Sequence, residues 1–385
     1  MLFRSVLFLR EQERLYNPQP RAIPAMLQSQ EYDIRVEVVA EGLDVPWAID
    51  FPDDRTMLIT ERPGRLRVVR EGQLLPDPVA GTPEVLNEGQ GGLLDVAVDP
   101  DFRSNGWVYL AYSHVLPQTP PGQRRPVAMT RVVRGRIDAM RWADQEVLLE
   151  ADPGTYRATR HHYGSRLVFD PQGLLYVAIG DRGHQADAQD PKRPNGKIHR
   201  IHRDGRIPAG NPFAAGGDGL PSVFSWGHRN PQGLAVHPQT GAVWETEHGP
   251  MGGDEINLIQ AGRNYGWPEV SYGRNYDGTV ITLLEHKPGM EQPVFFYRPS
   301  IAVCGLDFYR GELFPKWRNH LLLGALKDEQ VDVVTVHADR VLHAETVVKN
   351  LGRVRDVACG PDGAVYVVLN APGRVLRLTP IRDRG

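Results

Sequence analysis

The segment "SRLVFDPQGLLYVAIGD" (residues 165–181) contains two short apolar runs joined by the turn signal Asp-Pro-Gln-Gly. Apolar, β-rich runs on either side of a Gly/Pro turn are typical of a β-hairpin. The same arrangement recurs along the chain. The other copies are residues 46–61, 92–113, 232–249, 304–327 and 354–370. The sequence therefore predicts a chain built from repeated hairpins.

The spacing of these hairpins indicates how they are assembled. Their turns, taken at Pro52, Pro100, Pro171, Pro238, Arg310 and Pro361, lie 48, 71, 67, 72 and 51 residues apart. Further strand candidates, such as 65–73 and 374–380, lie between the copies. Six units of this size with four strands each predict an all-β, six-bladed β-propeller. Separate β-sandwiches are disfavoured because no copy is long enough to bury a core alone. The strand candidate 33–42 is expected to close the ring by pairing with the last blade.

Composition agrees with a fold rich in turns. The 385 residues include 40 Gly and 32 Pro, and 41% are hydrophobic, which is enough for a large core. The net charge is −3 and no basic stripe stands out, so nucleic acid is not an expected partner. No apolar run is long enough to span a membrane. We expect a poorly ordered leader over residues 1–30 without a clear signal peptide, followed by one propeller domain over residues 31–385.

The chain has two cysteines, Cys304 and Cys359, which form neither a disulfide framework nor a zinc cluster. They could pair with each other or remain separate buried thiols. The second alternative is favoured, because free cysteine is among the most buried residue types.

The hairpin repeat predicts where chemically capable residues gather. In a hairpin, the residues before the first strand and after the second lie at the same end. Blades share one orientation around the axis, so these positions should surround one mouth of the propeller. They include Gln90, His161, His162, Asp181, Arg229, Asn230, His248, Gly249, Pro250, Lys327, Arg353 and Arg355. This mouth is predicted to hold the functional site.

Two residues at this mouth suggest acid–base chemistry. His162 and Asp181 are 19 positions apart, but the hairpin between them returns the chain to the same end. A carboxylate beside an imidazole orients the ring and raises its basicity, as a general base requires. The alternative is a structural hydrogen bond, which is the commoner role for such a pair. His161 is expected to be structural.

Two further groups suggest ligands. The stretch 245–259 reads as a glycine-bearing loop with Asp254, Glu255 and Asn257, an oxygen-rich composition that suits Ca²⁺ or an ordinary polar turn. Three cations also converge on the mouth. They are Lys327, Arg353 and Arg355. Each alone would read as a surface charge, but together they favour a polyanionic ligand.

Several longer motifs carry a resemblance to a known family. They include "GQGGLLDVAVDPDF" (89–102), "HHYGSRLVFDPQGLLYVAIGDRG" (161–183), "GHRNPQGLAV" (227–236), "EHGPMGGDEINLI" (247–259) and "GRVRDVACGPDGAVYVV" (352–368). With these motifs, residues from about 40 to 380 resemble the soluble quinoprotein glucose/sorbosone (aldose sugar) dehydrogenases. That family has a six-bladed propeller fold, in agreement with the repeat count.

The resemblance implies an activity and its cofactors. Such enzymes oxidise the anomeric hydroxyl of an aldose to a lactone, using pyrroloquinoline quinone (PQQ) and Ca²⁺, and pass electrons to an external acceptor. His162 matches the base that takes the hydroxyl proton, and Asp181 matches its supporting carboxylate. The carbonyls of Gly249 and Pro250 match Ca²⁺ ligands. The matching cofactor-binding residues are Gln90, Arg229, Asn230, Lys327, Arg353 and Arg355.

The resemblance also shows departures and leaves alternatives. The family usually has a Trp before "PSIA", where this chain has Tyr297 and Arg298, and Tyr297 could replace a stacking aromatic. Family members are usually periplasmic or secreted, which is the expectation here. The alternative functions are a Ca²⁺-dependent lactonase-type hydrolase and a non-catalytic propeller that binds a glycan or a protein.

Overall fold

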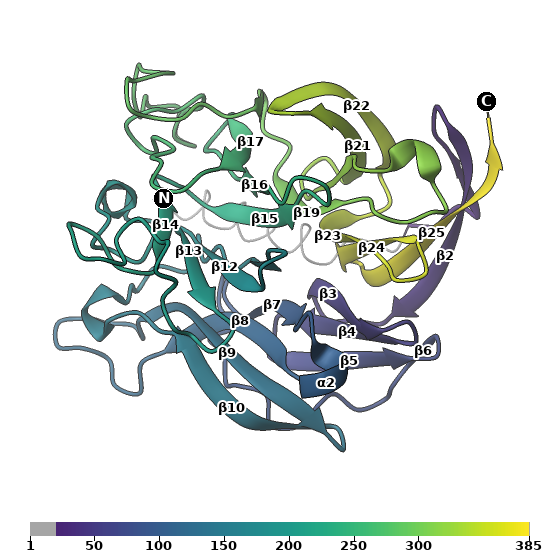
Figure 1. Cartoon of the computed structure of the whole chain (residues 1–385), viewed down its shortest axis with the longest axis horizontal. Coiled ribbons are helices and arrows are strands. Elements are labelled where there is room, and N and C mark those ends of the chain that lie inside the picture. The colour runs from purple at the N-terminus through teal and green to yellow at the C-terminus, as the bar shows by residue number, and fades with distance from the viewer. Residues whose placement is uncertain (1–20, 385) are drawn as a thin grey trace, which may run out of the picture.

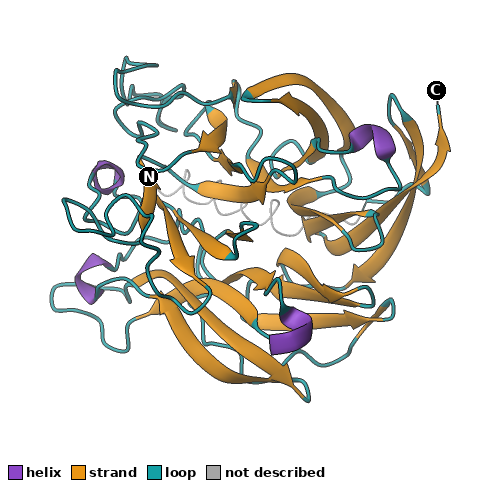
Figure 2. Ribbon diagram, in the orientation of Figure 1, coloured by secondary structure: helices purple, strands orange, loops and turns teal. Residues whose placement is uncertain are grey.

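The computed structural model describes residues 21–384, and nearly all of its regular structure is β (Figure 2). Six antiparallel sheets are arranged in a ring around one axis, as Figure 1 shows, which confirms the predicted six-bladed propeller. Each repeated hairpin supplies the two innermost strands of one blade.

The first three blades follow the chain in order. Blade 1 contains β3 (Pro46–Asp53), β4 (Thr56–Glu61), β5 (Arg65–Arg70) and β6 (Gln73–Leu74). Blade 2 contains β7 (Leu93–Val98), β8 (Val108–Val115), β9 (Ala128–Asp138) and β10 (Arg141–Leu149). Blade 3 contains β11 (Leu167–Phe169), β12 (Leu174–Ile179), β13 (Lys197–His202) and β14 (Val223–Trp226).

The other three blades repeat this order. Blade 4 contains β15 (Pro231–Val236), β16 (Val243–Glu247), β17 (Asp254–Ile259) and β18 (Phe295–Tyr297). Blade 5 contains β19 (Val303–Phe308), β20 (Leu321–Ala325), β21 (Gln330–His337) and β22 (Arg340–Lys349). Blade 6 contains β23 (Arg353–Cys359), β24 (Val365–Ala371), β25 (Gly373–Asp383), β2 (Tyr32–Glu41) and β1 (Met26–Gln28). Short helices lie outside the sheets. They are α2 (Phe102–Asn105), η1 (Pro153–Thr155), η2 (Gln185–Gln189) and η3 (Pro315–Trp317).

The ring closes through both ends of the described chain. β2 pairs antiparallel with β25, from Tyr32 opposite Asp383 to Glu41 opposite Arg374, so the expected closure is confirmed. β1 pairs in turn with β2, which places residues 26–28 in the sheet although a leader was expected there. Residues 1–20 of that expected leader lie outside the described residues.

The hydrophobic core lies between neighbouring blades. Trp47 and Leu58 of blade 1, for example, pack in one cluster with Leu93 and Val96 of blade 2. Burial of an aliphatic side chain of this size contributes roughly 1.5–3 kcal/mol, so each blade-to-blade contact adds substantially to stability. Both cysteines are buried and free, which agrees with the favoured alternative.

The innermost strand of every blade has no neighbouring strand on its axial side. Its backbone groups therefore need other partners. At four of the six blade junctions an aspartate of one innermost strand accepts a backbone N–H of the next. The pairs are Asp50 Oδ2 with Val98 N at 2.7 Å, Asp95 Oδ2 with Leu167 N at 2.7 Å, Asp307 Oδ2 with Cys359 N at 2.8 Å, and Asp356 Oδ2 with Ile49 N at 3.1 Å.

Threonine hydroxyls reinforce the junctions from the second strand. The Thr60 hydroxyl donates to the Leu94 carbonyl at 2.5 Å and accepts the Ala48 amide at 3.1 Å. In the same way the Thr246 hydroxyl donates to the Cys304 carbonyl at 2.8 Å. Side chains of one blade thus satisfy the backbone of the next.

We predict that Thr60→Val lowers the free energy of unfolding by about 1–2 kcal/mol, because valine keeps the shape but leaves the Leu94 carbonyl buried without its donor. Urea denaturation measures this change. Thr56→Val is the matched control, since Thr56 lies on the same strand and its side chain makes no hydrogen bond to any residue from 21 to 384. An equal effect of the two substitutions would contradict a specific role for the Thr60 hydroxyl.

Candidate functional site

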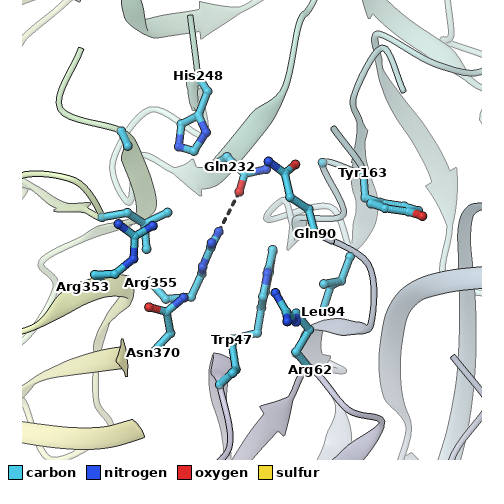
Figure 3. A pocket seen from close by; sticks show the side chains of 14 residues that line it. Trp47, Arg62, Gln90, Leu94, Tyr163, Gln232, His248, Arg353, Arg355 and Asn370 are labelled. Atoms are coloured by element: carbon cyan, nitrogen blue, oxygen red, sulfur yellow. Dashed lines mark hydrogen bonds between the residues drawn. The ribbon is translucent and has the colours of Figure 1, made fainter. Parts of the chain in front are cut away.

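A cavity opens at one end of the propeller axis, where the innermost strands of the blades begin. We call it the front cavity (Figure 3). Its lining includes Trp47, Arg62, Gln90, Leu94, Tyr163, Gln232, His248, Arg353, Arg355 and Asn370. With Ala302 and Leu326, which flank strands of blade 5, the lining residues come from all six blades or from the loops that enter them. The structure thus brings the predicted mouth residues Gln90, His248, Arg353 and Arg355 together in one lining.

His162 and Asp181 meet, as the hairpin predicts. His162 Nδ1 lies 2.7 Å from Asp181 Oδ1. The Asp181 side chain is fully buried, whereas 14% of the His162 side chain is exposed. The second Asp181 oxygen accepts the indole N–H of Trp267 at 2.8 Å, and the amide of Gly183 also donates to Oδ1. The carboxylate is thus held in one orientation.

The electrostatic surroundings set the protonation of this pair. Burial, followed by the nearby charge of Arg229, lowers the pKa of His162 to about 4, so the higher basicity expected from the neighbouring Asp181 carboxylate is outweighed. Burial opposes ionisation of Asp181, but His162 and Arg229 outweigh it and lower the pKa of that carboxyl. Near neutral pH the carboxylate is therefore ionised and the imidazole neutral. Because an ionised carboxylate only accepts, the proton lies on Nδ1 and leaves Nε2 basic.

A chain of hydrogen bonds connects the backbone next to His162 with Arg355 of blade 6. Arg355 donates to Gln232 Oε1 at 2.8 Å, the bond drawn in Figure 3, and Gln232 donates to Asn230 Oδ1 at 3.1 Å. Asn230 Oδ1 also accepts the Gly164 amide at 3.3 Å. On the other flank, Gln90 Oε1 accepts the His162 amide at 2.7 Å. Gln90 and Asn230 therefore fix the backbone around His162.

The predicted cations differ in position. Arg353 and Arg355 line the front cavity. Lys327 is exposed and donates to the Ser300 carbonyl at 2.8 Å, so it lies at the rim rather than in the lining. Arg229 is buried and lines a second, smaller cavity, which meets the front cavity at His248.

The second cavity contains both predicted metal ligands, Gly249 and Pro250, together with the carboxylates of Glu247 and Glu255. The Gly249 carbonyl accepts a hydrogen bond from Arg229 at 2.8 Å. The expectation of a loop over 245–259 is wrong at both ends. Glu247 lies on β16, and Asp254, Glu255 and Asn257 lie on β17. Glu247 pairs with Glu255, and Glu245 with Asn257, across these two strands of blade 4.

These paired strands bury an acidic group. His228, Glu245 and Glu247 present ligand atoms within 4.8 Å of one another, and all three are buried. The amide of Asn257 donates to Glu245, Glu247 and Glu255 together. Burial and then the charge of Glu247 raise the pKa of Glu245 and of Glu255 well above the usual range. Such a concentration of buried carboxylates attracts cations.

The donors of the site fit an anionic, acceptor-rich ligand. Among the described residues, the Nε–H groups of Arg229 and Arg355 are buried donors that have no hydrogen-bond partner in the protein. Buried donors without acceptors are costly, so these positions favour a ligand with several oxygen atoms. A tricarboxylate such as PQQ has that chemistry.

Sequence reasoning missed several residues of the site. Trp47, Gln232 and Asn370 line the front cavity, but they lie within strands, where their residue types gave no functional signal. Trp267 lies in a loop between β17 and β18 and contacts Asp181. None of the repeated hairpins connects this loop with Asp181, so the hairpin pattern did not predict the contact. Tyr297 lies on β18 and packs against the hydrophobic cluster between blades 4 and 5, whereas Trp47 and Tyr163 are the aromatic residues of the front cavity.

A six-bladed propeller with a cationic axial cavity beside a His–Asp pair defines the class of this protein. The family model described as glucose/sorbosone dehydrogenase matches residues 43–377, and the chain belongs to that family. The aldose sugar dehydrogenase YliI of Escherichia coli K12 is 41% identical over 354 residues, which cover 90% of this chain and 93% of that protein.

Solved structures agree with this assignment. The apo-form of the soluble aldose sugar dehydrogenase from Escherichia coli superposes with a TM-score of 0.83 at 40% identity, covering 90% of this chain and 99% of that one. The PQQ-bound aldose sugar dehydrogenase from Streptomyces coelicolor gives a TM-score of 0.72 at 25% identity, covering 93% and 99%. No helix among residues 21–384 is long and apolar enough to cross a membrane.

Proposed function

We propose that this protein is a PQQ- and Ca²⁺-dependent dehydrogenase that oxidises the anomeric hydroxyl of aldose sugars to lactones. The observation that carries the proposal is the neutral His162, which a buried carboxylate holds and whose chain neighbours Tyr163 and Gly164 line a cavity with three arginines. The PQQ-bound relative from Streptomyces coelicolor supports the cofactor. An external acceptor then takes the electrons, and we place the protein in the periplasm or outside the cell, as the family resemblance implies.

His162 acts as the general base in this proposal. Its Nε2 accepts the proton of the sugar's anomeric hydroxyl while Asp181 stabilises the imidazolium that forms. PQQ, when bound, supplies the acceptor for the hydride that leaves C1, so that C1 becomes the lactone carbonyl. A base of low pKa stays neutral and available through the mildly acidic range.

The front cavity would hold PQQ through charge. Arg353 and Arg355 would bind carboxylates and quinone oxygens from the lining, and Lys327 would contribute from the rim. Arg229 and Asn230 would complete the contacts beside His162, while Gln90 also fixes the His162 amide. The buried, unpartnered Nε atoms of Arg229 and Arg355 support this assignment.

We propose Ca²⁺ in the second cavity, with the carbonyls of Gly249 and Pro250 as ligands. The carboxylates of Glu247 and Glu255 line the same cavity and favour a divalent cation. Because the Gly249 carbonyl accepts from Arg229, a cation there requires the guanidinium to turn away toward an anion. A Lewis acid at this position would polarise a carbonyl of the bound cofactor.

The alternatives explain less of the site. A lactonase-type hydrolase needs a metal held by side-chain carboxylates at the axis, but the front cavity contains no carboxylate among its described lining residues. A non-catalytic binding propeller accounts for the fold but not for a buried carboxylate that orients a neutral histidine.

The proposal is tested by reconstitution. The protein is treated with a chelator and dialysed, PQQ and Ca²⁺ are added together or singly, and dye reduction is followed with a panel of aldoses. We expect reduction only with both additions. Absence of both PQQ binding and dye reduction would overturn the proposal.

We predict that His162→Ala lowers kcat by about 10²–10⁴-fold, because a positioned base contributes on that order. PQQ affinity, measured by fluorescence titration, should stay within about threefold of the wild-type value. An equal loss of affinity and turnover would show that His162 holds the site together rather than moving a proton.

We predict that Arg355→Ala weakens PQQ binding about 10- to 100-fold, since a lost charge-assisted hydrogen bond costs about 1.5–3 kcal/mol. The titration used for His162→Ala measures this effect. Arg206→Ala is the control, because Arg206 is an exposed arginine whose side chain pairs with Asp204. Equal affinities of the two variants would remove Arg355 from the cofactor site.

A further inference from the structure

Trp267 contacts the His162–Asp181 pair from a different blade. Its indole Nε1 donates to Asp181 Oδ2 at 2.8 Å, although the two residues are 86 positions apart and belong to different blades. Asp181 Oδ1 already accepts from His162 and Gly183. Within residues 21–384, the indole N–H is the only donor to the second oxygen, so it completes the contacts of a fully buried carboxylate.

The position of the Trp267 ring is set by its own surroundings. Its amide donates to the Gly227 carbonyl at 2.9 Å, and its carbonyl accepts from Gln189 at 2.7 Å. The ring is 5% exposed, and the Arg229 guanidinium lies 5.2 Å from its centroid. A ring fixed by backbone contacts presents its N–H at a constant place, which a flexible donor would not do.

A buried tryptophan in this protein does not need a partner for its N–H. Trp317 is 2% exposed, and its Nε1 is buried without any hydrogen-bond partner. The fold therefore tolerates an unpaired indole N–H in its core. The short bond from Trp267 to Asp181 is better explained by a requirement of the carboxylate than by a requirement of the indole.

We propose that Trp267 is a positioning residue, whose indole N–H fixes the Asp181 carboxylate and thereby holds His162 with Nε2 directed away from Asp181. Tryptophan suits this role because indole is a donor only and cannot reverse its polarity. A carboxylate whose second oxygen lacks a donor would rotate, and the imidazole would follow it. The inference rests on the proposed function for its consequence in catalysis, but the geometry itself is independent of any cofactor.

The test replaces the donor and leaves an aromatic ring. Trp267→Phe removes the N–H, and the isosteric replacement of Trp267 by benzothienylalanine removes it with almost no change of shape. Trp317→Phe is the matched control, since it removes a buried indole remote from Asp181. Circular dichroism and thermal unfolding establish that each variant is folded.

The first readout needs no activity. ¹⁵N-histidine NMR of the protein without cofactor follows the titration of His162, assigned by its loss in His162→Gln. The charged or titratable groups that face this ring are Asp181, Arg229 and His161. Loss of the Trp267 donor makes the Asp181 carboxylate more basic, so the titration of His162 should move up by as much as about one pH unit in both Trp267 variants. Trp317→Phe should leave it unchanged.

The second readout is kinetic. With PQQ and Ca²⁺ bound, both Trp267 variants should lower kcat about 10-fold while KM for the sugar stays within about twofold, because orientation of the base affects the transition state and not sugar binding. An unchanged His162 titration would overturn the proposal, even if kcat fell, because a structural role alone would then account for the loss. A wild-type protein that oxidises no aldose would refute the proposed function, whereas the NMR titration would still decide whether Trp267 positions the pair.

Discussion

The fold depends on how the backbone along the propeller axis finds hydrogen-bond partners. Each blade ends at the axis in a strand without a neighbour, and buried backbone groups that stay unpaired are costly. Arg166 provides the central solution. Its side chain is 6% exposed, forms ion pairs with Asp95 and Asp356, and donates to the carbonyls of Gln232 and Arg355. One guanidinium therefore joins blades 2, 3, 4 and 6.

This arrangement also shapes the site. Arg166 stacks over Trp47 at 4.2 Å, and Trp47 forms part of the wall of the front cavity. Arg166, Asp95 and Asp356 line a separate cavity on the other side of this contact. The buried ion pairs thus divide the axis, and the front cavity has the cations Arg353 and Arg355 in its wall. A net charge of −3 gives no indication of this local excess of positive charge.

The sequence predicted those parts of the molecule that local pattern determines. The six hairpins, the closure of the ring by residues 33–42 and the meeting of His162 with Asp181 all follow from strand periodicity and turn residues. What it could not predict depends on loops and on neighbouring blades. Trp267 reaches Asp181 from another blade. The carboxylates expected in a loop lie on paired strands instead, and the composition of this stretch does not reveal that Glu247 pairs with Glu255 across them.

The backbone around His162 shows why the site is better described as preorganised than as adaptable. His162, Ser165 and Arg182 have φ values of 57°, 81° and 55°, a left-handed conformation that costs side-chain-bearing residues on the order of 1 kcal/mol each. Hydrogen bonds hold each of them there: the His162 amide to Gln90, the Ser165 amide to the Ala178 carbonyl, and the Arg182 amide to the His162 carbonyl. Strain maintained by so many contacts fixes the direction of the imidazole before any ligand arrives. The same contacts connect the base to blades 2 and 3, so its orientation is a property of the assembled ring and not of the hairpin that carries it.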